Sequence, residues 1–198
     1  MNMYYQLLYS IIEKDVSLTE EDKLQIAEIF QYKTYKKNSF LIRASEVAHE
    51  VFFIIDGAAH QYYIDENGNE KSCAFMFENE FTTDLESFSG QTPATSFTVT
   101  LQPAKCLVAR CTELGALIRN NKAIADFFRI LVERIAATSF KRTKSLLTLS
   151  PEERFRELLN EQPEIFQKLP QRYIAQYVGI APESLSRIKN RIYRNQKS

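Results

Sequence analysis

The chain has 198 residues, of which 44% are hydrophobic, 12% aromatic and 25% charged, as expected for a globular protein rather than a disordered or fibrous one. Twenty-five Lys and Arg balance twenty-five Asp and Glu, so the net charge of zero indicates no class of partner by itself. The five glycines are too dispersed to form a GxGxxG or Walker loop, which excludes the enzymes that hold phosphates in such loops.

Cysteines and histidines are few and scattered. Cys73, Cys106 and Cys111 form no CxxC, and His49 and His60 form no HxH or HExxH, so we expect no metal site and no cofactor. A cupin-like metalloenzyme is a weak alternative because it needs clustered histidines. Since the chain also shows no secretory leader and no apolar run of about 20 residues, we predict a cytoplasmic protein without a membrane segment.

The first 30 residues predict two short helices. Apolar residues recur at helical spacing from Tyr4 to Ile12, and this first helix should end near Asp15. Thr19 is followed three residues later by Asp22, which is the spacing of a capping box, and an apolar stripe follows it as far as residue 30.

From Tyr32 to about Arg110 the pattern changes to short runs of β-branched and aromatic residues, at 51–55, 61–64, 72–76, 96–100 and 106–109. Turn residues separate these runs roughly every dozen positions. Asn67-Gly68, between two such runs, predicts a hairpin. We expect this region to form a β-sandwich or a β-roll.

A helical period returns after Gly115 and extends from about Asn121 to Leu149. Its apolar residues step by four and three, the spacing of a helix that packs against a partner helix. The candidate dimer interface consists of Ile124, Phe128, Leu131 and Ile135. A long helix packed on its own β-domain would show the same spacing, so both alternatives stay open.

The sequence Ser150-Pro151-Glu152-Glu153 marks the start of a further helix and of a new domain. It places Ser at the N-cap, Pro at the first helical position and Glu at the third. The apolar residues of this helix end before Pro163.

The segment 171–188 fits a helix-turn-helix. Small Ala175 lies where two steeply crossing helices would nearly touch, and Gly179 tolerates the positive φ of the turn. Pro182 suits the first turn of the second helix, where its missing N–H costs nothing. The inward apolar positions are Ile174, Val178, Ile180, Leu185 and Ile188.

The outward positions of the second helix are polar or basic, which suits a helix in the major groove of DNA. Arginine can bond guanine through two hydrogen bonds, and glutamate can accept one from cytosine. The candidate DNA-contacting residues are Arg172, Glu183, Ser184, Arg187, Lys189, Asn190 and Arg191. An ordinary helical hairpin with a solvated polar face is the alternative.

The zero net charge hides a strong asymmetry along the chain. Residues 141–198 contain twelve basic and six acidic residues, which gives this segment a charge of +6. Residues 1–140 contain thirteen basic and nineteen acidic residues, which gives a charge of −6. Residues 169–198 alone hold six basic residues and one acid. Such a basic terminus favours contact with phosphates, although it could also serve only solubility.

A β-rich domain, a long helix and a helix-turn-helix in this order resemble the Crp/Fnr family of bacterial transcription regulators over nearly the whole chain. The run 51–57 resembles the family's strand that ends in a turn glycine, and 79–81 with 95–99 resembles its phosphate-binding cassette. Glu183 and Arg187 match the family's base-reading pair.

The resemblance implies an α+β fold in three parts. A cyclic-nucleotide-binding-like β-roll (double-stranded β-helix) would occupy residues 1–119, a dimerisation helix 120–149, and a helix-turn-helix domain lacking a full wing 150–198. Residues 192–198 are too few for a two-stranded wing, so contacts to the DNA backbone would come from Lys189, Arg191, Arg194 and Lys197. Pro182 stands where the family often has a basic residue.

The cassette departs from the members that bind cyclic nucleotides. Asn79 stands where they carry Gly, and Thr95 where they carry the Arg that holds the cyclic phosphate, while Glu80 and Ser96 are retained. Losing that charge-assisted partner should lower nucleotide affinity at least about tenfold. We therefore predict a degenerate ligand cassette and no response to cAMP or cGMP. The cysteine cluster of the iron–sulfur members is also missing from the N-terminal region.

These features predict a non-enzymatic, homodimeric regulator that binds a pseudo-palindromic site on double-stranded DNA. RNA polymerase is a further partner that the resemblance allows, and the effector is unknown. The alternative is a ligand-binding adaptor whose C-terminal helices dock a protein partner. Salt distinguishes the two, because only phosphate contacts predict a steep loss of affinity with salt.

Overall fold

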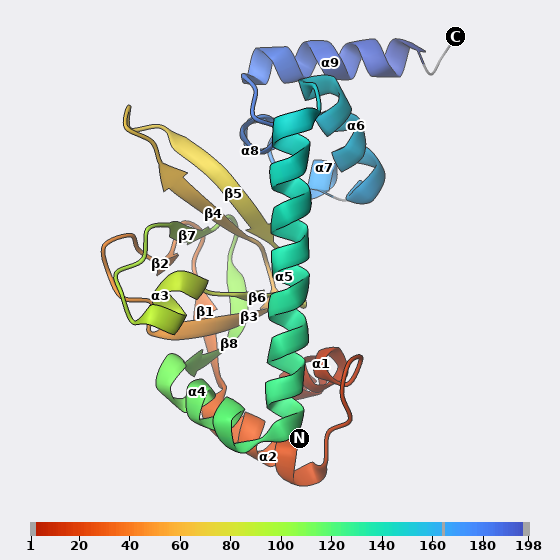
Figure 1. Cartoon of the computed structure of the whole chain (residues 1–198). Coiled ribbons are helices and arrows are strands. Elements are labelled where there is room, and N and C mark those ends of the chain that lie inside the picture. The colour runs from red at the N-terminus through yellow and green to blue at the C-terminus, as the bar shows by residue number, and fades with distance from the viewer. Residues whose placement is uncertain (1–2, 164, 196–198) are drawn as a thin grey trace. The chain divides into compact units, whose positions relative to one another are not determined.

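The computed structural model describes residues 3–163 and 165–195 of the chain (Figure 1). The chain divides into two compact units, Met1–Glu133 and Arg134–Ser198. The predicted α+β fold with an N-terminal β-roll is confirmed. The division into three domains at residues 119 and 149 stays a prediction.

Two helices, α1 (Met3–Ile12) and α2 (Glu20–Ile29), open the first unit, as predicted. The capping box before α2 is confirmed: the Thr19 Oγ1 accepts from the Asp22 N–H at 3.1 Å, and the Asp22 carboxylate accepts from the Thr19 N–H at 2.8 Å. Two of the orphan donors at the start of α2 are thereby satisfied by residues that the sequence alone identifies.

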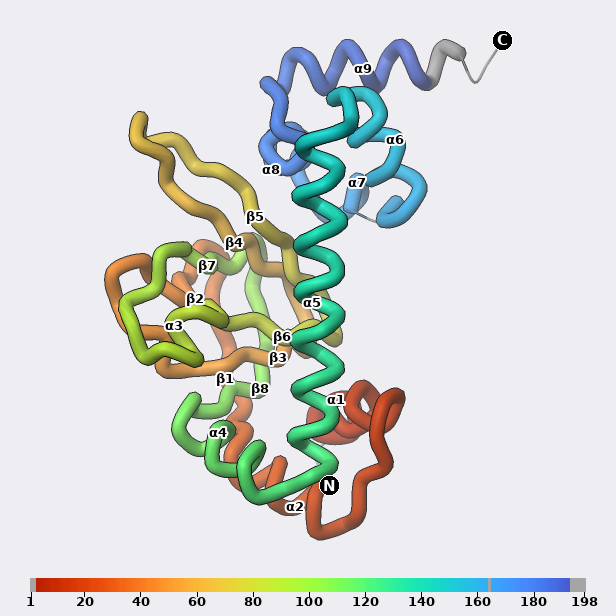
Figure 2. Tube along the Cα trace, viewed as in Figure 1, coloured from red at the N-terminus to blue at the C-terminus, as the bar shows by residue number. Residues whose placement is uncertain are grey.

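In the described part of the chain, eight strands form two antiparallel four-stranded sheets, with the orders β1-β8-β3-β6 and β2-β7-β4-β5. The strands are β1 (Gln31–Tyr35), β2 (Phe40–Ile42), β3 (Glu50–Asp56), β4 (Ala59–Ile64), β5 (Glu70–Met76), β6 (Phe81–Thr82), β7 (Phe97–Thr100) and β8 (Ala104–Arg110). The predicted hairpin joins β4 to β5 (Figure 2). Gly68 in its turn has φ of 80°.

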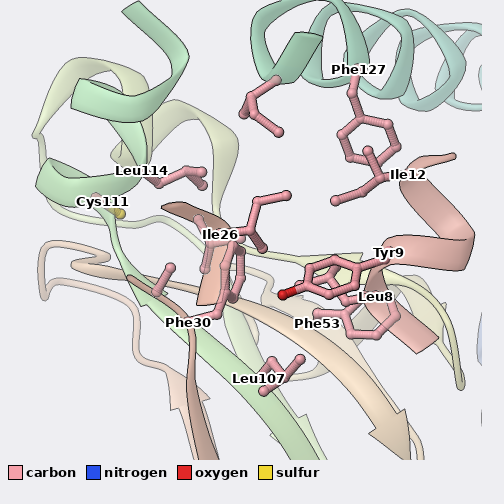
Figure 3. Close-up of a cluster of buried hydrophobic side chains, with 13 residues drawn as sticks. Leu8, Tyr9, Ile12, Ile26, Phe30, Phe53, Leu107, Cys111, Leu114 and Phe127 are labelled. Atoms are coloured by element: carbon pink, nitrogen blue, oxygen red, sulfur yellow. The ribbon is translucent and has the colours of Figure 1, made fainter. Parts of the chain in front are cut away.

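Two apolar clusters hold this unit together. One fills the roll between the sheets, with Phe52 and Ile54 of β3 opposite Ala59 and Met76. The other lies between the first sheet and the helices, where Leu8, Tyr9 and Phe127 are among the labelled side chains in Figure 3. This unit also contains the helices α3 (Leu85–Gly90) and α4 (Cys111–Asn120) and the first part of α5 (Lys122–Thr148).

Every element that the structure describes after Arg110 is a helix. The long helix α5 (Lys122–Thr148) matches the predicted range to within a residue at each end and is continuous in Figure 1. The second capping box is confirmed, because the Ser150 Oγ accepts from the Glu153 N–H and the Glu153 carboxylate accepts from the Ser150 N–H. The remaining helices are α6 (Pro151–Glu161), α7 (Ile165–Lys168), α8 (Gln171–Val178) and α9 (Pro182–Asn195).

Candidate functional site

The helices α8 and α9 form the predicted helix-turn-helix. Ala175 is fully buried where the helices approach each other, and Gly179 follows α8 in the left-handed conformation with φ of 80°. An L-residue at this turn would be strained, which is the physical reason for the glycine. Ile174, Val178, Leu185, Ile188 and Ile192 are buried and fix α9 to the rest of its unit.

The exposed stripe of α9 is formed by Glu183, Arg187, Asn190 and Arg191. All four side chains are exposed, and their spacing places them on one side of the helix, away from the buried Leu185. Ser184 lies beside this stripe and is half-buried. This part of α9 therefore presents one acidic, one amide and two guanidinium groups together, which is a set able to read base edges.

The other two predicted DNA-contacting residues are placed differently. Lys189, one turn after the buried Leu185, lies beside the buried face and is half-buried, so it does not belong to the exposed stripe. Arg172 is exposed on α8, where its guanidinium lies 4.6 Å from the Tyr173 ring centre and donates to the Tyr173 hydroxyl at 3.0 Å. Lys197 lies outside the described residues, as does the side chain of Arg194.

Arg191 already has an intramolecular partner. Its guanidinium pairs with the carboxylate of Glu152 in the first turn of α6. Glu152 also accepts from Arg156 at 2.9 Å, and the hydrogen bond from Arg156, followed by the charge of Arg191, lowers the pKa of Glu152. A phosphate contact by Arg191 would have to compete with this carboxylate.

The cassette residues do not converge on an open site. Asn79 and Thr95 are exposed, and Asn79 has φ of 73° in a turn. The carboxylate of Glu80 is exposed and accepts from the Phe77 N–H at 2.8 Å. Ser96, in contrast, is fully buried. Of the predicted cassette residues, Glu80 closes its own turn, while Ser96 faces the interior.

The partner of Ser96 is Asp84, a residue that sequence reasoning missed. The Ser96 hydroxyl donates to Asp84 Oδ2 at 2.6 Å and accepts from the Gln61 side-chain amide at 2.9 Å. Asp84 is buried and caps α3, its Oδ1 accepting from the Ser87 N–H at 3.0 Å. An Asp three residues before a Ser at the start of a short helix was the available signal. The cassette thus contains its own buried carboxylate.

The predicted dimer residues of α5 belong mostly to the core of their own unit. Ile124 is only 1% exposed within the apolar cluster between the first sheet and the helices, and Phe128 and Leu131 pack against the same cluster. Ile135 is half-buried. The assignment of Ile124 to a dimer interface is therefore corrected, because its side chain is already buried within the chain.

A different face of α5 is exposed and apolar. Phe140 is 77% exposed and Leu147 is 80% exposed. Ala136 and Thr143 are also exposed. In chain order the four residues are separated by four, three and four positions. We call Ala136, Phe140, Thr143 and Leu147 the outer stripe of α5. Its periodicity is that of a helix-packing seam.

The described residues contain no group of three or more His, Cys, Asp or Glu side chains that could hold a metal ion. None of the helices in the described part of the chain combines the length and the apolar character needed to span a bilayer. Burial raises the pKa of the Cys106 thiol to about 12 and that of Cys111 to about 11. These two thiols are therefore protonated at neutral pH and are poor nucleophiles.

The chain consists of a β-roll module followed by a helix-turn-helix module. Residues 32–121 match the family model of the cyclic nucleotide-binding domain. FixK2 from Bradyrhizobium japonicum is similar with a TM-score of 0.74 at 14% identity, over 85% of this chain and 86% of that one. The regulator CLP from Xanthomonas campestris gives a TM-score of 0.71 at 12% identity, over 87% and 91%.

A regulator assigned to the Crp/Fnr family from Eubacterium rectale has a TM-score of 0.68 at 14% identity, over 90% of this chain and 85% of that one. No curated protein matches the sequence. Residues 32–121 are therefore similar to the cyclic nucleotide-binding domain, and the chain has the fold of the solved Crp/Fnr regulators. The fold that the resemblance implies is thereby confirmed.

Proposed function

We propose that the chain is a sequence-specific DNA-binding transcription regulator of the Crp/Fnr type that acts as a homodimer. The exposed stripe of α9 carries this proposal, since it presents Glu183, Arg187 and Asn190 on a helix fixed by buried side chains. The basic charge of residues 169–198 supports contact with phosphates. The fold shared with regulators such as CLP, described as a global regulator, supports the same class.

Selection from a pool of random duplexes, followed by fluorescence anisotropy, tests DNA binding. We expect a pseudo-palindromic site to be enriched. Arg187→Ala should lower affinity for it about tenfold or more, because one bidentate base contact contributes about 1–3 kcal/mol. Arg119→Ala, which removes an exposed arginine from α4, is the matched control and should leave affinity unchanged.

Failure to enrich any sequence would refute sequence-specific binding. Equal losses in Arg187→Ala and Arg119→Ala would show that only overall charge matters. A partner bound with an affinity indifferent to salt would favour the protein-docking adaptor, since phosphate contacts weaken steeply as salt rises.

The homodimer is proposed to form through the outer stripe of α5, with a second copy of this chain as the occupant. Phe140 and Leu147 expose large apolar side chains at heptad-like spacing, which is what a matching helix of another copy would cover. Because Ile124 and Phe128 pack within the chain, this interface lies on a different face from the one that the spacing first indicated.

Light scattering on the purified chain tests the dimer. Phe140→Glu should convert a dimer to a monomer, because a carboxylate would be buried in the seam. Leu24→Glu places the same charge on another exposed leucine, in α2, and should stay dimeric. A monomeric wild type, or a Phe140→Glu variant that remains dimeric, would show that the outer stripe is not the interface.

We further propose that the chain does not respond to cAMP. Thr95 supplies no cation for a phosphate, and the buried hydroxyl of the neighbouring Ser96 already donates to the Asp84 carboxylate. A second anion beside that carboxylate would be repelled. Calorimetric titration with cAMP should show no binding at micromolar concentrations, and micromolar affinity would overturn this part of the proposal.

No catalytic activity is proposed. A transcription regulator of this class would contact RNA polymerase and would be located in the cytoplasm. Both remain expectations from the sequence. Chromatin precipitation in the source cell followed by transcript measurement would show whether bound sites are activated or repressed.

A further inference from the structure

The end of α8 is held by two arginines from other helices. An α-helix leaves its last four carbonyls without partners inside the helix. In α8 these are the carbonyls of residues 175–178, and the first two of them are satisfied locally. The Gly179 N–H donates to the Ala175 carbonyl at 2.9 Å and to the Gln176 carbonyl at 3.1 Å. The carbonyls of the last two residues, Tyr177 and Val178, are left for other donors.

Those donors come from α5 and α6. Arg142 of α5 donates through Nη2 to the Tyr177 carbonyl at 3.0 Å, and its guanidinium lies 3.5 Å from the centre of the Tyr177 ring. Arg154 of α6 donates through Nε to the Val178 carbonyl at 2.8 Å and through Nη1 to the Leu149 carbonyl at 2.6 Å. All four terminal carbonyls of α8 are thereby satisfied.

This geometry uses properties that are specific to arginine. Its planar fork allows Arg154 to bind the carbonyl after the end of α5 and the last carbonyl of α8 at the same time. Both carbonyls lie at the negative ends of helix dipoles, where a cation is favourable. A lysine could provide the charge but not two separate N–H groups in fixed directions.

Further contacts fix α5 to α6 in the same unit. The Ser145 hydroxyl donates to the Glu157 carboxylate at 2.6 Å, and the Lys141 ammonium lies 2.5 Å from a Glu161 carboxylate oxygen. The C-terminal half of α5, α6 and α8 are therefore joined by polar contacts as well as by apolar packing. The outer stripe of α5 belongs to this unit, as does the exposed stripe of α9.

We propose that Arg142 and Arg154 are positioning residues that set the distance between the two DNA half-sites. This inference rests on the proposed function. A dimer formed through the outer stripe would carry two copies of α9. The distance between these two helices decides which spacing of the DNA half-sites fits, and in helix-turn-helix dimers that spacing is about one helical turn of DNA. Because α8 precedes α9 directly and is held by the two arginines, loosening its end frees α9 to turn relative to α5.

Anisotropy with the full-length chain on three duplexes tests this proposal. They are the selected site, the same site with one base pair added between its halves, and a single half-site. In wild type we expect the added base pair to weaken binding. In Arg142→Gln the ratio of the affinities for the selected site and for the lengthened site should fall about tenfold, which is the factor expected for one lost charge-assisted hydrogen bond. The affinity for the single half-site should stay unchanged.

Two further variants sharpen the result. Arg154→Lys keeps the charge but removes the fork, and should also relax the spacing requirement. Lys144→Gln removes one charge from an exposed position of α5, two residues from Arg142, and should behave as wild type. Circular dichroism and the melting temperature report whether each variant is folded.

The outcomes separate the two proposals. A wild type without any sequence preference would refute the proposed function. A sequence-specific wild type whose spacing preference persists in Arg142→Gln and Arg154→Lys would refute the positioning role alone. Half-site and full-site affinities that fall in parallel would mean that the arginines only stabilise the fold, which would also overturn the proposal.

Discussion

Two threonines on β7 should respond in opposite ways to the same substitution. Thr98 and Thr100 are both fully buried and two residues apart, so they lie on the same face of the strand. The Thr100 hydroxyl accepts from the Ser39 N–H at 2.9 Å and donates to the Lys36 carbonyl at 2.7 Å. The Thr98 hydroxyl has no hydrogen-bond partner among the residues that the structure describes.

Replacing each threonine by valine exchanges one hydroxyl for a methyl group. A hydroxyl buried without a partner costs about 1–3 kcal/mol, so Thr98→Val should stabilise the chain by about 1 kcal/mol. In a chain of this size that corresponds to a rise in melting temperature of about 2–4 °C. Thr100→Val should instead destabilise by about 1–3 kcal/mol, because it leaves the Ser39 N–H without its acceptor.

Urea unfolding followed by far-ultraviolet circular dichroism measures both changes in the first unit. The expected difference between the variants is about 2–4 kcal/mol, well above the scatter of such curves. A Thr98→Val variant as destabilised as Thr100→Val would refute the reasoning, since it would mean that the Thr98 hydroxyl is satisfied in solution.

Three other predictions follow from local geometry. The hydrogen bond from the Asn69 N–H, together with smaller effects of other donors such as Lys71, lowers the pKa of Asp65 to about 2. The ionised Asp65 therefore contributes its full stabilisation above about pH 4, and this stabilisation is lost as the pH falls through about 2. Acid unfolding should show that loss in wild type and not in Asp65→Asn. Gly179→Ala should cost about 1 kcal/mol in thermal unfolding because of the positive φ, and an unchanged melting temperature would contradict this. The raised pKa values of Cys106 and Cys111 predict that both thiols resist a thiol reagent at pH 8 until the chain is denatured, whereas rapid labelling of both would contradict their burial.

The sequence was most informative where a local hydrogen bond decides the structure. The two capping boxes and the turn glycines, Gly68 and Gly179, were identified because each residue type has a specific chemical role at that place. The helix-turn-helix was predictable for the same reason. Its small residue, its turn glycine and its apolar positions must all occur at fixed spacings.

Spacing alone could not identify the partner of a buried face. The residues from Ile124 to Ile135 have the period of a helix seam, yet Ile124 packs on its own unit. Periodicity shows which residues are buried, not whether the contacts come from the same chain. The role of Asp84 was missed for a related reason: its contact with Ser96 joins positions twelve residues apart and depends on how α3 meets β7.

The hydrogen bonds of α3 have a consequence for local opening of the fold. This helix has six residues, whereas an isolated helix needs about 12–15 to persist in water. Its Ser87 hydroxyl accepts from the Ala48 N–H at 2.8 Å and donates to the Thr92 carbonyl at 2.5 Å, while its cap Asp84 accepts from Ser96. The amides of α3 should therefore exchange with deuterium as slowly as the strands around them, because the helix cannot open without opening the roll.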